Sequence, residues 1–206
     1  MGVGFLRRLF ALILIGLFAA APVAVAAETG PSAEAAKATI EHFYDGLLAT
    51  MKQGPELGFK GRTEKLAPLV EQTYSLDFMA RLIVGAKWTS LDTPDKDMVL
   101  AAFKDWVVAN YASQFTSFSG EKFVTGEVTD GGRGTSVVQT QIVPSDGKPV
   151  SLGYRMLNGK VIDVYLEGSV SQLALWRSQF ASVIGKDGIA GLIDRLKSQA
   201  EKLAGS

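Results

Sequence analysis

The chain has 206 residues, no cysteine, a single histidine (His42) and 21 residues of each charge sign. The lack of cysteine excludes disulfides, zinc–thiolate sites and thiol nucleophiles, and the neutral balance gives no footprint of a nucleic-acid-binding protein. The lone histidine excludes a two-histidine metal site and leaves one built with carboxylates open. We predict neither a metal nor a cofactor.

The chain begins with the layout of a secretory signal peptide. Arg7 and Arg8 precede an apolar run over residues 9–18, and small residues follow. Charged, apolar and small-residue regions in this order are typical of a cleaved export signal. The run is shorter than the about 20 residues that a membrane-spanning helix needs, which disfavours an uncleaved anchor. We expect residues 1–27 to be the signal peptide and residues 28–206 to form one exported domain.

The first half of this domain is predicted to be helical. After a flexible start over 28–34, apolar residues spaced three and four apart predict a helix over 35–52, ended by Gly54-Pro55. Three more helices are predicted: residues 63–74, a short one from about 75 to 85, and one that begins at Thr93-Pro94 with the threonine hydroxyl as its cap.

The pattern changes to strands near Phe123. Four strands are predicted, over residues 123–128, 136–143, 150–157 and 161–166, with turns at Asp130-Gly131-Gly132, Asp146-Gly147 and Asn158-Gly159. Two final helices are joined by a turn at Lys186-Asp187-Gly188. This order indicates an α+β fold, with helices packed on one face of a curved antiparallel sheet of four to five strands.

The last hairpin has two possible registers. A two-residue turn at Asn158-Gly159 pairs Leu157 with Lys160 and sets apolar residues against charged ones. A three-residue turn that includes Lys160 collects the apolar residues of both strands on one face and puts Arg155 opposite Asp163 on the other. Because a one-residue slip turns every side chain over, we predict the three-residue turn and an Arg155–Asp163 pair.

No catalytic motif is complete. The segment 168–171 lacks the Gly-x-Ser-x-Gly elbow of a serine hydrolase, and the glycines near Gly131 do not open a helix as a phosphate loop does. Asp163 and Glu167 lie about 13 Å apart along a strand, which is too far for a shared proton. The abundant apolar residues fit either a filled core or a lipid-sized cavity between sheet and helices, and periodicity does not distinguish them.

Four segments, in matching order, resemble the MlaC, or toluene-tolerance, family. Residues 75–88 resemble its short helix that ends in Leu-Gly-x-x-Trp, and residues 153–156 its Tyr-Arg strand. Residues 162–171 resemble its Asp-Val-x-x-Glu-Gly-x-Ser signature, and residues 176–180 its Arg-x-x-Phe helix. The resemblance implies a nuclear-transport-factor-like cone with an apolar cavity, in a single lipid-binding domain.

The resemblance also implies a function and partners. Members of this family are periplasmic carriers that pass phospholipid between an inner-membrane ABC transporter, with its MCE-domain subunit, and an outer-membrane lipoprotein complex. Two departures resemble the hopanoid-associated HpnM branch instead: Gly159-Lys160 where the family has a tryptophan, and residues 168–174 where it reads Gly-Val-Ser-Leu-Val. Phospholipid and hopanoid therefore both remain open as cargo.

The resemblance implies a set of apolar or aromatic residues that contact the lipid tails. They come from the short helix, the long helix after it, the sheet and the helix that follows the sheet: Phe78, Leu82, Ile83, Phe103, Val107, Tyr154, Val164, Leu166, Trp176 and Phe180.

Two other functions remain open beside the carrier. One is an isomerase or dehydratase on the same cone-like fold, acting on a hydrophobic substrate with Asp163 as a buried carboxylate and Tyr154 as a hydrogen-bond donor. The other is a periplasmic binding or assembly module with a solid core. We expect a carrier and not an enzyme, because a cavity hides apolar area from water without any reacting group.

Overall fold

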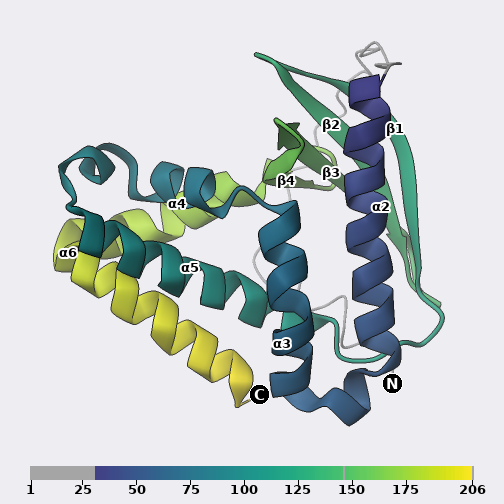
Figure 1. The fold of residues 1–206 in the computed structure, drawn as a ribbon, viewed down its shortest axis with the longest axis horizontal. Helices are drawn as coiled ribbons and strands as arrows, with labels where there is room; N and C mark the ends of the chain where they lie inside the picture. Colours follow the sequence, from purple (N-terminus) through teal and green to yellow (C-terminus); the bar gives the residue numbers. More distant parts are fainter. Residues whose placement is uncertain (1–30, 146, 206) are drawn as a thin grey trace.

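The structure, a computed structural model, describes residues 31–145 and 147–205, so the predicted signal peptide and Asp146 of a predicted turn lie outside it. Helices come first and last along the chain, with the strands between them (Figure 1). The elements are α2 (Pro31–Lys52), α3 (Gly54–Thr73), α4 (Leu76–Val84), the 3-10 helix η1 (Gly85–Ser90), α5 (Thr93–Gln114), β1 (Lys122–Gly132), β2 (Thr135–Val143), β3 (Val150–Leu157), β4 (Lys160–Leu166), β5 (Val170–Ser171) and α6 (Gln172–Ala204). Among the described helices, none has the length and apolarity needed to cross a membrane.

The strands form one antiparallel sheet in chain order, β1 to β5, which confirms the predicted meander and the α+β class. The first hairpin turns at Arg133 and Gly134, both with positive φ, and not at the predicted Asp130-Gly131-Gly132. Strand β1 contains two register shifts and runs on to Gly132, so its hairpin turn comes later than the glycine pattern indicates.

The last hairpin corrects the predicted turn and confirms the predicted face. Asn158 and Gly159, with φ of 50° and 75°, form a two-residue turn in which Leu157 pairs with Lys160. A bulge at Ile162 then shifts the register, so that Tyr154 lies opposite Val164 and Leu152 opposite Leu166. The bulge, and not a longer turn, matches the apolar residues of the two strands.

Arg155 lies opposite Asp163, as predicted, but the two side chains have other partners. The Arg155 guanidinium donates hydrogen bonds to Thr135 Oγ1, Tyr165 Oη and the Gly131 carbonyl oxygen. The Asp163 carboxylate turns instead toward the start of α6. Register alone therefore does not make the pair an ion pair.

Helix α2 lies across one face of the sheet, with α3 beside it (Figure 1). Its apolar side is fully covered, with Ile40, Phe43 and Leu47 all 0% exposed. Helix α3 begins at Gly54, nine residues before the predicted start, and contains a kink at Gly58. Gly54-Pro55 ends one helix and begins the next, because proline fits the first turn of a helix.

Helices α4, α5 and α6 form an arm beside the sheet (Figure 1). Helix α4 lies between Ser75 and Gly85, as predicted, and the Ser75 amide donates to the Val161 carbonyl oxygen of β4 (2.9 Å). The cap of α5 is Asp92, whose carboxylate accepts from the Asp95 amide, and not the predicted Thr93. Helix α6 bends at Gly188, where a turn between two helices was predicted.

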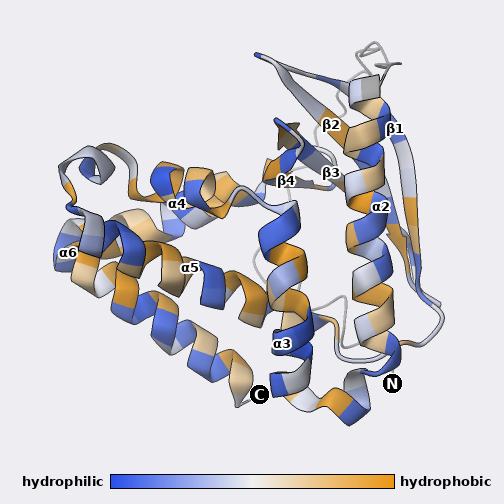
Figure 2. Ribbon diagram, viewed as in Figure 1, coloured by the Kyte–Doolittle hydropathy of each residue, from blue (hydrophilic) through white to orange (hydrophobic). Residues whose placement is uncertain are grey.

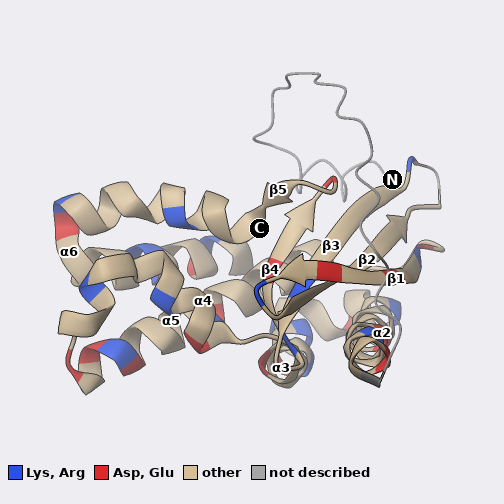
Figure 3. Cartoon of the chain, turned by 90° about the horizontal axis from the view of Figure 1, so that it is seen from above, with Lys and Arg blue, Asp and Glu red and all other residues tan. Residues whose placement is uncertain are grey.

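Polar and apolar residues alternate along this arm (Figure 2). Acidic and basic residues are mixed along the described helices, and neither sign gathers into one patch in the view of Figure 3.

Candidate functional site

A cavity of about 660 Å³ lies between the sheet, α5 and the two halves of α6. Its volume falls in the range of small-molecule sites, roughly 300–1,000 Å³. The sheet wall is apolar apart from one hydroxyl and consists of Ile142, Leu152, Tyr154, Val164 and Leu166. The predicted apolar cavity between sheet and helices is therefore present.

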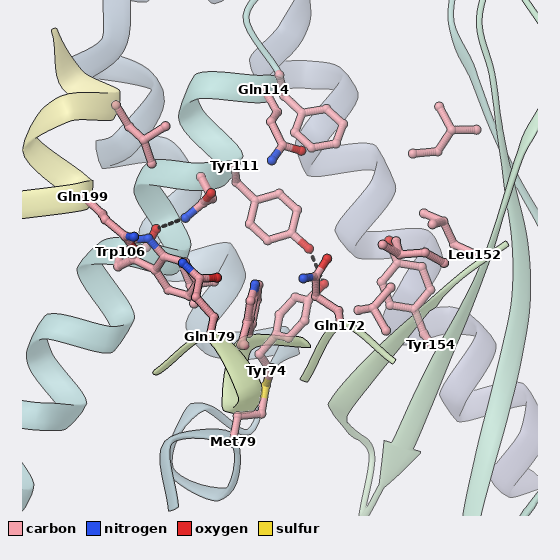
Figure 4. A pocket seen from close by; sticks show the side chains of 18 of the residues that line it. Tyr74, Met79, Trp106, Tyr111, Gln114, Leu152, Tyr154, Gln172, Gln179 and Gln199 are labelled. Carbon is pink, nitrogen blue, oxygen red and sulfur yellow. Dashed lines mark hydrogen bonds between the residues drawn. The ribbon is translucent and has the colours of Figure 1, made fainter. Parts of the chain in front are cut away.

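Tyrosines line the cavity at Tyr74 and Tyr111, between its helix side and the sheet, and at Tyr154 on the sheet (Figure 4). The hydroxyls of Tyr74 and Tyr111 are hydrogen-bonded to each other, and Tyr44 behind them donates to Thr140 Oγ1 (2.7 Å). The ring of Phe43 packs edge-on against Tyr74, Tyr111 and Tyr154.

These phenols are neutral near pH 7, and burial extends their neutral range to higher pH. Burial raises the pKa of Tyr44 to about 12 and the pKa of Tyr74, Tyr111 and Tyr154 above the ordinary value. Near neutral pH this part of the cavity therefore offers hydroxyl groups and no charge.

The helix wall carries carboxamides, which the sequence analysis did not single out. Among the described lining residues these are Asn110, Gln114, Gln172, Gln179 and Gln199, and Lys202 is the one charged side chain. A signal was present, because Gln172, Trp176 and Gln179 are spaced four and three apart and therefore share one face of α6. Two amides beside a tryptophan on one helix face are unusual for a face that packs into a filled core.

Five of the ten predicted contact residues line the cavity: Val107, Tyr154, Val164, Leu166 and Trp176. Phe103 and Phe180 lie behind its wall in an aromatic cluster, where Phe103 contacts Trp176 and Phe180 contacts Trp106. For all ten predicted residues, contact with a lipid stays a prediction.

On α4 the predicted residues do not line the cavity. Ile83 is buried elsewhere, Phe78 is half-buried, and Leu82 is 37% exposed. Met79 reaches the cavity in their place. It lies one position after Phe78, a step of about 100° around the helix, so a small error in the assumed orientation selects the wrong residue.

Asp163, the acid of the enzyme alternative, has a structural role. Its carboxylate accepts hydrogen bonds from the amides of Val164 and Leu173 and from Ser171 Oγ, at 2.6–2.9 Å. It is not among the lining residues and does not meet Tyr154 in the cavity. These bonds hold the start of α6 against β4 and so set one edge of the cavity.

Within residues 31–145 and 147–205, no group of three or more histidine, cysteine, aspartate or glutamate side chains could hold a metal ion. His42 lies on the exposed side of α2, away from the cavity.

The chain was compared with known proteins. The profile of a family described as "MlaC protein" matches residues 41–198. Among solved structures, the fold is similar to that of a phospholipid-binding protein from Ralstonia solanacearum, solved in complex with a phospholipid. The two are 25% identical with a TM-score of 0.67, and the match covers 82% of this chain and 98% of the other. A search of curated proteins found no significant match.

Proposed function

Since the chain belongs to the MlaC family, we propose that it binds a phospholipid in the cavity between the sheet and α6 and carries it between two membranes. The family match extends over most of the chain and includes all the described lining residues except Gln199, Lys202 and Leu203, which follow its end.

The cavity itself is the observation that carries this proposal. Each methylene group removed from water is worth about 0.8 kcal/mol, so an acyl chain gains several kcal/mol from a dry apolar site. The sheet wall offers such a site through Leu152, Val164 and Leu166. The neutral tyrosines add hydrogen-bonding capacity without a buried charge.

The Ralstonia solanacearum protein supports the same cargo. It holds a phospholipid on a similar fold, and the match covers nearly all of its length. We take phospholipid as the cargo on this ground, and a hopanoid stays a prediction from the sequence.

We place the carrier in the periplasm, after cleavage of the signal peptide expected over residues 1–27. A carrier there needs a donor and an acceptor in the two membranes. The family resemblance suggests an inner-membrane ABC transporter with an MCE-domain subunit on one side and an outer-membrane lipoprotein complex on the other. These partners and this location are part of the proposal.

The enzyme alternative has less support. It requires Asp163 as a base in the cavity, and this carboxylate lies outside the lining with three hydrogen bonds to the chain around it. A carrier requires no reacting group, and so the observed lining is sufficient for it.

Native mass spectrometry of the protein purified from cells expressing the full chain tests this function. We expect a bound mass that matches a phospholipid, released on unfolding and identified after organic extraction. A lipid-free protein that also takes no phospholipid from labelled vesicles would overturn the proposal. A retained hopanoid would keep the carrier and replace its cargo.

A further inference from the structure

The amides of Gln179 and Gln199 and the ammonium of Lys202 lie on the helix side of the cavity, opposite the sheet (Figure 4), and the exposure of the lining residues shows how a lipid would lie between them. Gln179 and Lys202, on the helix side, are exposed, whereas Leu152 and Tyr154, on the sheet side, are 5% and 3% exposed. Figure 4 shows Gln179 and Gln199 beside Trp106, across the cavity from Leu152 and Tyr154. A lipid with its tails toward the sheet therefore places its headgroup beside Gln179, Gln199 and Lys202.

One of these amides lacks a partner. The side-chain oxygen of Gln199 is buried, and within the described residues it accepts no hydrogen bond. A buried polar atom without a hydrogen-bond partner lowers the stability of the protein. The NH₂ group and the oxygen of the Gln199 amide exchange places when the end of the side chain rotates by half a turn. A hydroxyl group is both donor and acceptor, so it would satisfy Gln199 in either orientation.

The positive charge of Lys202 on this side of the cavity favours a phosphate group next to that hydroxyl. Lys202 is the one charged side chain among the described lining residues, and none of them is acidic. A single ammonium at the rim complements a single phosphodiester charge and offers nothing to a cationic headgroup. The amides of Gln179 and Gln199 then lie where the group esterified to that phosphate would be.

Resting on the proposed function, we propose that the amides on this side recognise the headgroup alcohol, so that the carrier selects phospholipids whose headgroup bears hydroxyl groups. A site built to hydrogen-bond a hydroxyl rejects an analogue without it, because its own polar groups are then left unpaired. Selection then acts on the headgroup, because the apolar sheet wall leaves the acyl chains largely unselected.

A pair of matched lipids tests this directly. Phosphatidylglycerol and phosphatidylpropanol with identical acyl chains carry the same single charge and differ in the two headgroup hydroxyls. The protein is incubated with vesicles that contain both in equal amounts, reisolated, and its lipid is extracted and counted. We expect at least a fivefold excess of phosphatidylglycerol.

A cavity variant, its control and a second cavity variant locate the effect. Gln199→Leu keeps the size of the side chain, removes the amide, and should reduce the excess to less than twofold. Gln72→Leu makes the same change on the exposed side of α3, away from the cavity, and should keep the wild-type ratio. Gln179→Leu, at an exposed rim position, provides a second cavity variant if Gln199→Leu does not fold.

Equal uptake of the two lipids by the wild-type protein would overturn the headgroup proposal and leave the carrier function intact. An excess of phosphatidylglycerol that persists in both Gln199→Leu and Gln179→Leu would also overturn it. Failure to take up either lipid would instead count against the carrier function.

Discussion

The sheet uses one face in two different ways. Under α2 this face is filled, because Tyr44 of α2 packs against Phe123 and Tyr154 of the sheet, and Leu47 and Met51 of the same helix are 0% exposed. Opposite α5 and α6 the same face, through Val164 and Leu166, borders a cavity of about 660 Å³. Both regions are built from amphipathic helices and from strands in which apolar and polar residues alternate. Only the region under α2 is filled by side chains.

The path of the helices accounts for the difference. Helix α2 lies across the sheet, whereas α6 leaves from its edge at β5 and bends back at Gly188 (Figure 1). The two regions also differ in polarity. Carboxamides face the cavity, whereas the polar groups buried under α2 are hydroxyls with partners, as in the Tyr44–Thr140 bond. Carboxamides along the helix wall, one of them with an unpaired buried oxygen in Gln199, thus distinguish the hollow region.

The largest expected effect is in the filled region. Phe43→Ala should lower the free energy of unfolding by about 3–5 kcal/mol, because the aromatic side chain is removed from a fully packed site. Urea unfolding followed by circular dichroism measures this. A loss below about 1 kcal/mol would mean that the region under α2 is not close-packed.

The tyrosines at the boundary between the two regions give a pH dependence. Burial raises the pKa of Tyr44 from 10.0 to about 12, so the folded state holds its proton where the unfolded state releases it. This raised pKa contributes about 2–3 kcal/mol to the free energy of unfolding. The contribution is complete below pH 10 and is lost as the pH rises to 12.

This loss is measured by urea unfolding between pH 9 and 12, with Tyr44→Phe as the comparison. The variant should lose less stability over this interval than the wild-type protein. Parallel curves would show that Tyr44 titrates normally and is not buried at the boundary.

The bend in α6 should have a smaller effect. Gly188 has φ 70° and ψ −160°, a conformation that only glycine adopts readily, so Gly188→Ala should cost about 1–3 kcal/mol. Gly185→Ala is the matched control in the same helix, where an added Cβ meets no atom within 4 Å and alanine favours the helix. Equal effects of the two substitutions in thermal unfolding would contradict the assigned role of Gly188.

The fold was predictable because its signals are local. Apolar and polar residues alternate along residues 150–166, which predicts the apolar face of the sheet. Ser75 and Gly85 mark the two ends of α4. Turn lengths were not predictable, because the bulge at Ile162 compensates for a shorter turn at Asn158-Gly159. The start of α3 was missed because Gly54-Pro55 signals both a helix end and a helix start.

The site was predictable only in part. Val107, Trp176 and the sheet residues follow from the apolar pattern, which marks the inward faces. Whether an inward face meets another side chain or an open space depends on how far apart the elements lie, and the sequence contains no measure of that distance. The amides of Gln179 and Gln199 were missed because an isolated glutamine on a helix usually faces solvent.

Filling the cavity tests the central claim most directly. Val164→Trp adds a large side chain to the sheet wall of the cavity, whereas Val138→Trp adds it to the filled region, where Val138 is 0% exposed. The first variant should stay within about 1 kcal/mol of the wild-type stability, and the second should be clearly destabilised by overpacking.

The decisive measurement is native mass spectrometry of Val164→Trp beside the wild-type protein. We predict that the wild-type protein retains a phospholipid and that the folded variant retains at most a tenth as much. A folded Val164→Trp protein with the wild-type amount of lipid would contradict the claim that this cavity is where the lipid is carried.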